Sequence, residues 1–349
     1  MEQIYYADGV KKQKTREMYQ KIFTEDSPGF VDYYYEWKTR ENRVLVMEED
    51  GKQQGMLHQN PYCLQIFDDQ AVCDYIVAVA TCPQYRRQGK MQRLMKAALE
   101  EMYRKEQPFT FLLPADPAYY QGQGFVYTPI RPEHISGIGA LDLNGEKIEG
   151  RAACEKDYEE MAEFSNRTLK EQKDIFVVRT PSYYRRLAAE TASESGGVVL
   201  LTEESGIAGI LAYGTEAQEE SKKSRKKKET GVSVKELILL EKYQIHAEEI
   251  CRRVLGTEQI TWEPMHMMVR ITNLQRLCGM LRSNTPMQLK IMLWDEMIPE
   301  QSGSYEICIG DTESSIRRIP KEEAEREMEA AELAKELFKD TEFFIQEWV

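Results

Sequence analysis

The feature that most constrains the fold is an apolar run followed by a basic loop and an amphipathic helix. Residues 74–81 read DYIVAVAT, which has the length and the β-branched content of a buried central strand. In residues 89–105 apolar side chains recur at the spacing of one buried helix face, at Met91, Leu94, Met95, Ala98, Leu99 and Met102. Residues 109–113, FTFLL, predict a further strand. This strand, loop, helix and strand succession is the strongest local pattern in the chain.

The loop between that strand and that helix has the chemistry of a phosphate site. It contains Arg86, Arg87, Gln88, Gly89, Lys90 and Met91. The first turn of a helix has backbone N–H groups without intrahelical partners, and the helix dipole favours an anion there. Gly89 lets the backbone approach a phosphate closely, and Arg86 and Arg87 can add charge-assisted contacts.

Three blocks of further elements are expected. The first contains helices at 11–23 and 30–38 and a hairpin of strands at 43–47 and 55–64. The second starts near Ile148 and contains a helix capped by Asp157, a short helix from Pro181, and strands at 198–202, 206–213 and 232–240. The third starts near Met265 and contains strands at 268–271, 287–293 and 305–309, a helix at 274–281, and an acidic helix, KEEAEREMEAAELAKELF, after Pro320.

Two motifs carry a family resemblance. Residues 77–95, VAVATCPQYRRQGKMQRLM, resemble the acetyl-coenzyme A motif of the GNAT superfamily of acetyltransferases, whose loop reads Arg/Gln-x-x-Gly-x-Gly/Ala. About thirty residues later, residues 120–125, YQGQGF, resemble the Tyr-x-x-x-Gly-Phe element of the same superfamily. The loop departs from the general pattern at Met91, and a bulkier residue there is similar to members of the Eis (enhanced intracellular survival) branch.

This resemblance implies an α+β fold with three domains. We expect a GNAT domain with a mixed central sheet flanked by helices over residues 1–145, a second degenerate GNAT-like domain over 146–264, and a small sterol-carrier-protein-like α/β domain over 265–349. Resemblance to the Eis branch also implies a homo-oligomer, commonly a hexamer.

The same resemblance implies roles for named residues. Val79, Ala80 and Thr81 would pair with the pantetheine of acetyl-coenzyme A, and the backbone N–H of Val79 would donate to the thioester oxygen. The residues from Arg86 to Met91 would hold the pyrophosphate. Tyr120 would be the general acid that protonates the departing thiolate.

In Eis-like enzymes the C-terminal carboxylate acts as the base, and the matching group is that of Val349. The last residues, FFIQEWV, are mostly apolar and therefore favour burial over the frayed state that is usual at chain ends. Two alternatives stay open. Tyr120 could be core packing with Tyr119 and Phe125, and the tail could dock in the third domain for packing alone.

Charge and cysteine content narrow the function classes. The formal net charge of −13 argues against nucleic-acid binding and suits a cationic acceptor. Seven scattered cysteines and an N-terminus without a signal-peptide pattern indicate a reduced, cytoplasmic protein. Four histidines without ligand spacing predict no metal site, and no run has the length of a membrane span.

The function that we expect is transfer of an acetyl group from acetyl-coenzyme A to a primary amine, on a small molecule or a lysine, by direct attack. Two alternatives belong to other classes. One is a regulator that binds acetyl-coenzyme A without turnover. The other is a lipid carrier built on the C-terminal block.

Overall fold

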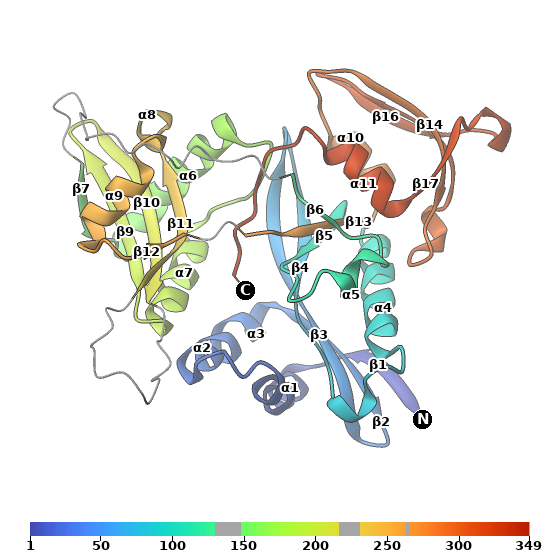
Figure 1. The fold of residues 1–349 in the computed structure, drawn as a ribbon, viewed down its shortest axis with the longest axis horizontal. Helices are drawn as coiled ribbons and strands as arrows, with labels where there is room; N and C mark the ends of the chain where they lie inside the picture. Colours follow the sequence, from blue (N-terminus) through green and yellow to red (C-terminus); the bar gives the residue numbers. More distant parts are fainter. Residues whose placement is uncertain (130–147, 216–230, 263–264, 349) are drawn as a thin grey trace.

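A computed structural model describes residues 1–129, 148–215, 231–262 and 265–348. We call residues 1–129 the first unit, 148–262 the second unit and 265–348 the third unit. Each unit contains a sheet of its own with helices packed on it (Figure 1). The mixed α+β architecture expected from the sequence is confirmed.

The first unit supplies most of a nine-stranded sheet. Its own strands are β1 (Glu2–Tyr6), β2 (Arg43–Glu49), β3 (Lys52–Ile66), β4 (Asp69–Thr81), β5 (Phe109–Leu112) and β6 (Val126–Tyr127). The path along the sheet is β1-β2-β3-β4-β5-β13-β6, in which β13 (Met268–Ile271) comes from the third unit. Beside β3 lies β8 (Ile175–Val177) of the second unit, which in turn pairs with β18 (Phe343–Phe344) near the chain end. All three units therefore contribute to this sheet.

Helices cover both faces of the first sheet. One face carries α1 (Gly9–Ile22), α2 (Pro28–Tyr33), a π-helical turn (Tyr34–Lys38) and α3 (Thr39–Glu41), whose tyrosines 33, 34 and 35 are buried. The other face carries α4 (Lys90–Arg104) and the short α5 (Ala118–Gln121) (Figure 1). At Gly55 on β3 a side chain would lie 2.9 Å from Leu94 Cδ1 of α4. The absent side chain thus lets α4 approach the sheet closely.

The second unit repeats this layering on a smaller scale. Its sheet has the order β12-β11-β10-β9-β7, made of β7 (Glu149–Ala152), β9 (Gly197–Glu203), β10 (Gly206–Thr215), β11 (Val232–Leu239) and β12 (Ile260–Thr261). Alternate residues of β11 point to opposite faces, because Ile238 packs with one cluster while Leu237 and Leu239 pack with another. The two faces are covered by α6 (Tyr158–Gln172) with α7 (Pro181–Ser193), and by α8 (Glu241–Gln244) with α9 (Ala247–Leu255).

Asp157 does not cap α6 in the predicted way. Its carboxylate accepts hydrogen bonds from the Arg151 guanidinium at 2.6 and 2.8 Å and from the Cys154 N–H at 2.7 Å. These contacts hold the 3₁₀ turn Glu155–Asp157 that precedes the helix. The predicted position is right, since Asp157 is the N-cap residue of α6, but its side chain forms no capping hydrogen bond with that helix because Arg151 and the Cys154 N–H occupy the carboxylate.

The third unit contains a four-stranded sheet of order β16-β15-β14-β17. Its elements are α10 (Leu274–Met280), β14 (Met287–Trp294), β15 (Gly303–Ile309), β16 (Ser314–Arg318), β17 (Arg326–Glu329) and α11 (Ala330–Phe338), with short 3₁₀ turns at Pro299–Gln301 and Lys321–Glu323. The predicted acidic helix is wrong in its first half. Residues 326–329 pair with β14 in parallel and bury Met328, so strand pairing overrides their helical composition.

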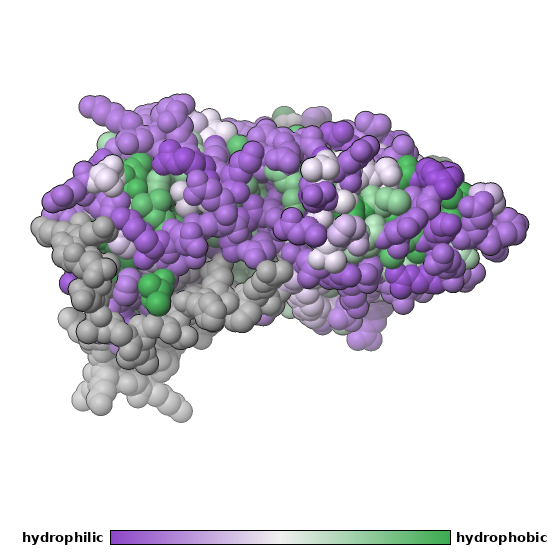
Figure 2. All heavy atoms as spheres, turned by 90° about the horizontal axis from the view of Figure 1, so that it is seen from above, coloured by the Kyte–Doolittle hydropathy of each residue, from purple (hydrophilic) through white to green (hydrophobic). Residues whose placement is uncertain are grey.

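The described surface is mostly hydrophilic. Seen from above, hydrophobic side chains form separate patches between larger polar areas (Figure 2). Among the helices of the described residues, none is both long and apolar enough to cross a membrane.

Candidate active site

The central strand β4 separates from its neighbour β5 halfway along its length. On one side β4 pairs with β3 from Asp69 to Thr81. On the other side it pairs with β5 only at Tyr75, opposite Phe111. No described strand therefore pairs with this edge of β4 after Tyr75. An extended ligand can use backbone groups that are left open in this way, as an added strand would.

A bulge lies at the point of separation. The register with β3 shifts between Met56 and His58, and Ala78 has a left-handed φ of 49°. The predicted pantetheine-binding residues Val79, Ala80 and Thr81 follow directly and end the strand. A bulge re-aims the backbone groups of a strand, and bulges occur often beside active sites.

The loop after β4 leads into an uncapped helix start. A 3₁₀ turn, Pro83–Tyr85, ends the strand, as predicted from Pro83. Gly89 stands at the N-cap of α4 with φ 70°, and no side chain caps the helix. The side chains of Arg86, Arg87 and Gln88 are exposed around it. The first-turn N–H groups of α4 and two guanidinium groups are thus available to an anion.

Lys90 is placed differently from the other loop residues. Its side chain is 6% exposed, and its ammonium lies 2.9 Å from a carboxylate oxygen of Glu2 on β1. The hydrogen bond from Lys90 lowers the pKa of Glu2, with Arg93 adding to the effect. The Lys90 side chain therefore connects the helix start to β1. Only its backbone N–H is left to bind an anion at the loop.

Tyr120 lies on α5 beside the same helix start. The amide of Gln123 contacts Met91 Sδ at 3.4 Å, which joins the tyrosine loop to the first turn of α4. Tyr120 is 7% exposed and its ring meets Phe125 edge-on at 5.8 Å. Burial raises the pKa of Tyr120 to about 12. The hydroxyl accordingly stays protonated at neutral pH, and no described residue forms a hydrogen bond with it.

The Tyr120 ring packs on one of the two aromatic neighbours that the sequence suggested. Its contact with Phe125 is core packing, whereas Tyr119 is 63% exposed and does not belong to the core. The loop is held from the third unit, since the Arg270 guanidinium donates to the Gln123 carbonyl at 2.7 Å. Gly124 has φ 85°, and a side chain there would lie 3.2 Å from Arg270 Nε.

A pocket of about 310 Å³ opens where β4 and β5 separate. Its walls come from α1 and α2, from β4, from the second unit and from the chain end, and are mainly aromatic. They include Tyr19, Phe23, Phe30, Tyr34, Tyr75 and Trp348. Two carboxylates, Asp26 and Glu194, and the ammonium of Lys235 also line it.

The last described residues reach this pocket. Phe344 and Ile345 are buried, as the apolar tail predicted. Phe343–Phe344 pairs with β8 of the second unit, and the Phe343 ring also lies 5.4 Å from the ring of Phe338 in the third unit. The Trp348 carbonyl lies 3.5 Å from the Tyr75 hydroxyl. Val349, the predicted base, lies outside the described residues.

Several pocket residues were not identified from the sequence. Asp26 accepts a hydrogen bond from the Tyr19 hydroxyl at 2.7 Å, and burial raises its pKa. Glu194 and Lys235 form an ion pair at 2.8 Å. These residues are far apart in the sequence and belong to no motif, so no local signal marks them. In the described part of the chain, no group of three or more His, Cys, Asp or Glu side chains is arranged to hold a metal ion.

Comparisons with known proteins agree with the sequence motifs. Residues 11–128 match the family model of the acetyltransferase (GNAT) domain. A search of curated proteins finds no match. Among solved structures, a GCN5-related N-acetyltransferase from Anabaena variabilis is similar, with a TM-score of 0.74, 16% identity, and coverage of 96% of this chain and 89% of that chain.

Two further structures have the same overall fold. One is a probable N-acyltransferase from Enterococcus faecalis, with a TM-score of 0.73 at 14% identity, covering 96% of this chain and 89% of that one. The other is Eis1 from Mycobacterium abscessus, with a TM-score of 0.68 at 11% identity, covering 97% and 89%. The predicted enzyme class is confirmed, since residues 11–128 match the acetyltransferase (GNAT) domain.

Proposed function

We propose that the protein transfers an acetyl group from acetyl-coenzyme A to a primary amine by direct attack. The amine nitrogen forms a bond to the thioester carbonyl carbon, the carbon–sulfur bond breaks, and the sulfur leaves with the electron pair. A protonated amine must first lose one proton to become nucleophilic, its nitrogen loses a second proton as the amide forms, and one proton must reach the thiolate. Placing both reactants against the same stretch of strand would supply much of the rate. The observation that carries the proposal is the separation of β4 from β5 directly before an uncapped helix start.

In this proposal the pantetheine pairs with Val79, Ala80 and Thr81, and the Val79 N–H donates to the thioester oxygen. The bulge at Ala78 and the open edge of β4 support this placement. The pyrophosphate lies at the start of α4, where backbone N–H groups from Gly89 to Met91 face no capping side chain.

Tyr120 is proposed as the general acid. A phenol whose pKa is about 12 is fully protonated at neutral pH and so has a proton to give to the thiolate. Support also comes from the contact between Gln123 and Met91, which places the tyrosine loop next to the helix start.

The carboxylate of Val349 is proposed as the base. Support comes from Trp348, the preceding residue, which lines the pocket and lies beside the Tyr75 hydroxyl. We propose that the acceptor is a cationic amine with an apolar part, because the pocket combines aromatic walls with two carboxylates, Asp26 and Glu194, of which Lys235 pairs only with Glu194.

The sterol-carrier-like character of the third unit and a homo-oligomeric assembly also stay proposals. The small sheet of the third unit with α10 and α11 on it supports the first. Contacts of the third unit with β5 and β6 through β13 indicate a role in assembling the first sheet.

Release of free thiol from acetyl-coenzyme A tests the activity. The panel consists of polyamines, aminoglycosides and lysine peptides, with matched alcohols as controls. We expect amine-dependent thiol release. Binding of acetyl-coenzyme A without release for any acceptor would instead favour the regulator that only binds it.

A further inference from the structure

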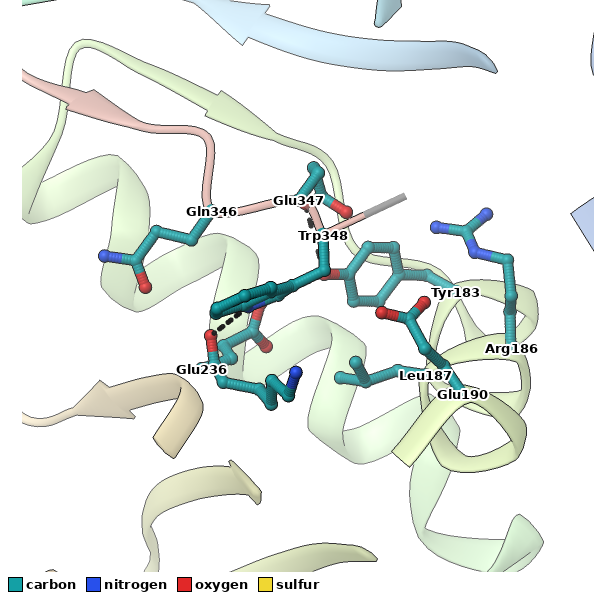
Figure 3. Close-up of a pocket in the computed structure, with 9 residues that line it drawn as sticks. Tyr183, Arg186, Leu187, Glu190, Glu236, Gln346, Glu347 and Trp348 are labelled. Atoms are coloured by element: carbon teal, nitrogen blue, oxygen red, sulfur yellow. Dashed lines mark hydrogen bonds between the residues drawn. The ribbon is translucent and has the colours of Figure 1, made fainter. Parts of the chain in front are cut away.

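A buried cluster of charged groups connects the second unit to the chain end. Arg179 lies between β8 and α7, and its side chain is 0% exposed. Its guanidinium pairs with Glu236 of β11 and lies 3.6 Å from Glu347 of the tail. The Tyr183 hydroxyl lies between the same two carboxylates, 3.0 Å from Glu236 and 3.2 Å from Glu347 (Figure 3).

Arg179 is itself held firmly in place. The amide side chain of Asn166 on α6 accepts from the Arg179 N–H and donates to the Arg179 carbonyl, both at 2.8 Å. The guanidinium also donates to the Val177 carbonyl at 2.5 Å and lies 4.3 Å from the centre of the Tyr183 ring. The anchor for Glu347 is therefore built mainly from α6, α7 and β11, and the Phe344 ring of the tail lies 5.5 Å from the Arg179 guanidinium.

The next tail residue is held by the same unit and faces the pocket. Lys235 Nζ lies 3.8 Å from the centre of the Trp348 ring, and the Trp348 indole N–H donates to the Lys235 carbonyl at 3.4 Å. Trp348, Lys235 and Glu194 all line the pocket that opens beside β4. The position of this pocket wall thus depends on where Glu347 is anchored.

Stability alone does not explain such a cluster. Removing charges from water is costly, and well-packed apolar side chains often stabilise a protein as well as a buried ion pair does. What hydrogen-bonded charges add is a fixed register, because a carboxylate must sit where its donors point. A purely apolar tail could slide along its groove.

We propose that Arg179 and Tyr183, together with Glu236, are positioning residues that anchor Glu347 and thereby hold Trp348 in the wall of the acceptor pocket. The second unit then contributes to the acceptor site without binding acetyl-coenzyme A. The catalytic part of this inference rests on the proposed function.

The test uses Glu347→Gln in the full chain, with Glu342→Gln as the matched control. Glu342 lies in the same tail, and its carboxylate is 34% exposed beside Lys173. We expect amide hydrogen exchange in residues 343–348 to rise about tenfold in Glu347→Gln, since a hydrogen bond to a charged group is lost. The KM for the amine should rise about tenfold while the affinity for acetyl-coenzyme A stays unchanged.

Arg179→Lys keeps the charge but loses the planar fork, so we expect an intermediate rise in both quantities. Exchange and amine KM in Glu347→Gln that equal those of Glu342→Gln would overturn the inference. Faster exchange with an unchanged amine KM would also overturn it, because the tail would then be anchored without shaping the pocket. If the wild-type protein acetylates no amine, the proposed function fails, whereas the exchange measurement still decides whether Glu347 is anchored.

Discussion

The first and second units have the same arrangement of strands but differ at one decisive point. The order β1-β2-β3-β4-β5 in the first unit corresponds to β7-β9-β10-β11-β12 in the second, and both end with a parallel pair. In each unit helices come after the first and the fourth of these strands. The fourth strand is β4 in one unit and β11 in the other.

The segment after this fourth strand differs between the two units. After β4 come a basic loop, a left-handed Gly89 and a helix of fifteen residues with no acidic residue in its first turn. After β11 comes the four-residue α8 with Glu241 in its first turn, and then α9 with Glu248 and Glu249 in its first turn. Carboxylates at a helix start occupy the place that an anion would take and repel it. The two sheets are similar, but only the helix start after β4 suits the proposed coenzyme site.

The comparison also teaches what the second unit contributes in place of a coenzyme site. Its fourth strand carries Lys235, which contacts Trp348 of the chain end, and Glu236, which shares the donors Arg179 and Tyr183 with Glu347. Function therefore depends on the residues at the strand ends more than on the fold that both units share.

The largest expected effect is on the free energy of unfolding, and it concerns β13, the strand that extends the first sheet beyond β5. Arg270 of β13 and Asp295 form an ion pair at 2.6 Å with both side chains 1% exposed. Asp295→Ala leaves the guanidinium buried without its partner, so we expect a loss of about 3–5 kcal/mol in the free energy of unfolding. Urea denaturation measures it. Asp311→Ala, an exposed aspartate of the same unit, should change this free energy by less than about 0.5 kcal/mol.

The second effect concerns Tyr120, the proposed general acid beside the coenzyme site of the first unit. Tyr120→Phe removes the proposed proton donor and keeps the ring packed on Phe125. We expect kcat to fall about 10²-fold or more with little change in the affinity for acetyl-coenzyme A. Steady-state kinetics and a binding titration measure the two quantities. Turnover equal to that of the wild type would leave Tyr120 with a packing role alone.

A smaller effect is expected from a one-residue extension after Val349. The extension moves the proposed base away from the pocket but leaves the anchor at Glu347 in place, so we expect kcat to fall about tenfold. An alanine inserted in the exposed turn at Asp50–Gly51 serves as the control for added length. Full activity of the extended chain would remove the Val349 carboxylate from the mechanism.

The parts of the site that lie in one stretch of chain could be predicted. The helix after the loop, its buried face and the uncapped start at Gly89 can be inferred from local periodicity and turn chemistry, and the structure has them at α4. The Lys90 side chain was expected at the pyrophosphate, but it pairs with Glu2, a residue 88 positions away. The local sequence pattern around Lys90 cannot indicate a partner that is so far away in the chain.

The pocket could not be predicted for the same reason. Asp26 comes from the first unit, Glu194 and Lys235 from the second and Trp348 from the tail, so these residues line one pocket only in the folded chain. The position of β13 between β5 and β6 could not be predicted either. The residues MVRI predict a strand, but they do not indicate which strands pair with it. The predicted boundaries at 145 and 264 remain predictions.

Calorimetric titration of the protein with acetyl-coenzyme A tests the central claim most directly. We predict saturable binding with a stoichiometry of one per chain, and a clear loss of affinity when Arg86 and Arg87 are both replaced by alanine, while Arg252→Ala with Arg253→Ala on α9 has no effect. Absence of binding would contradict the acetyl-coenzyme A site at the start of α4, and two sites per chain would contradict the distinction between the two units.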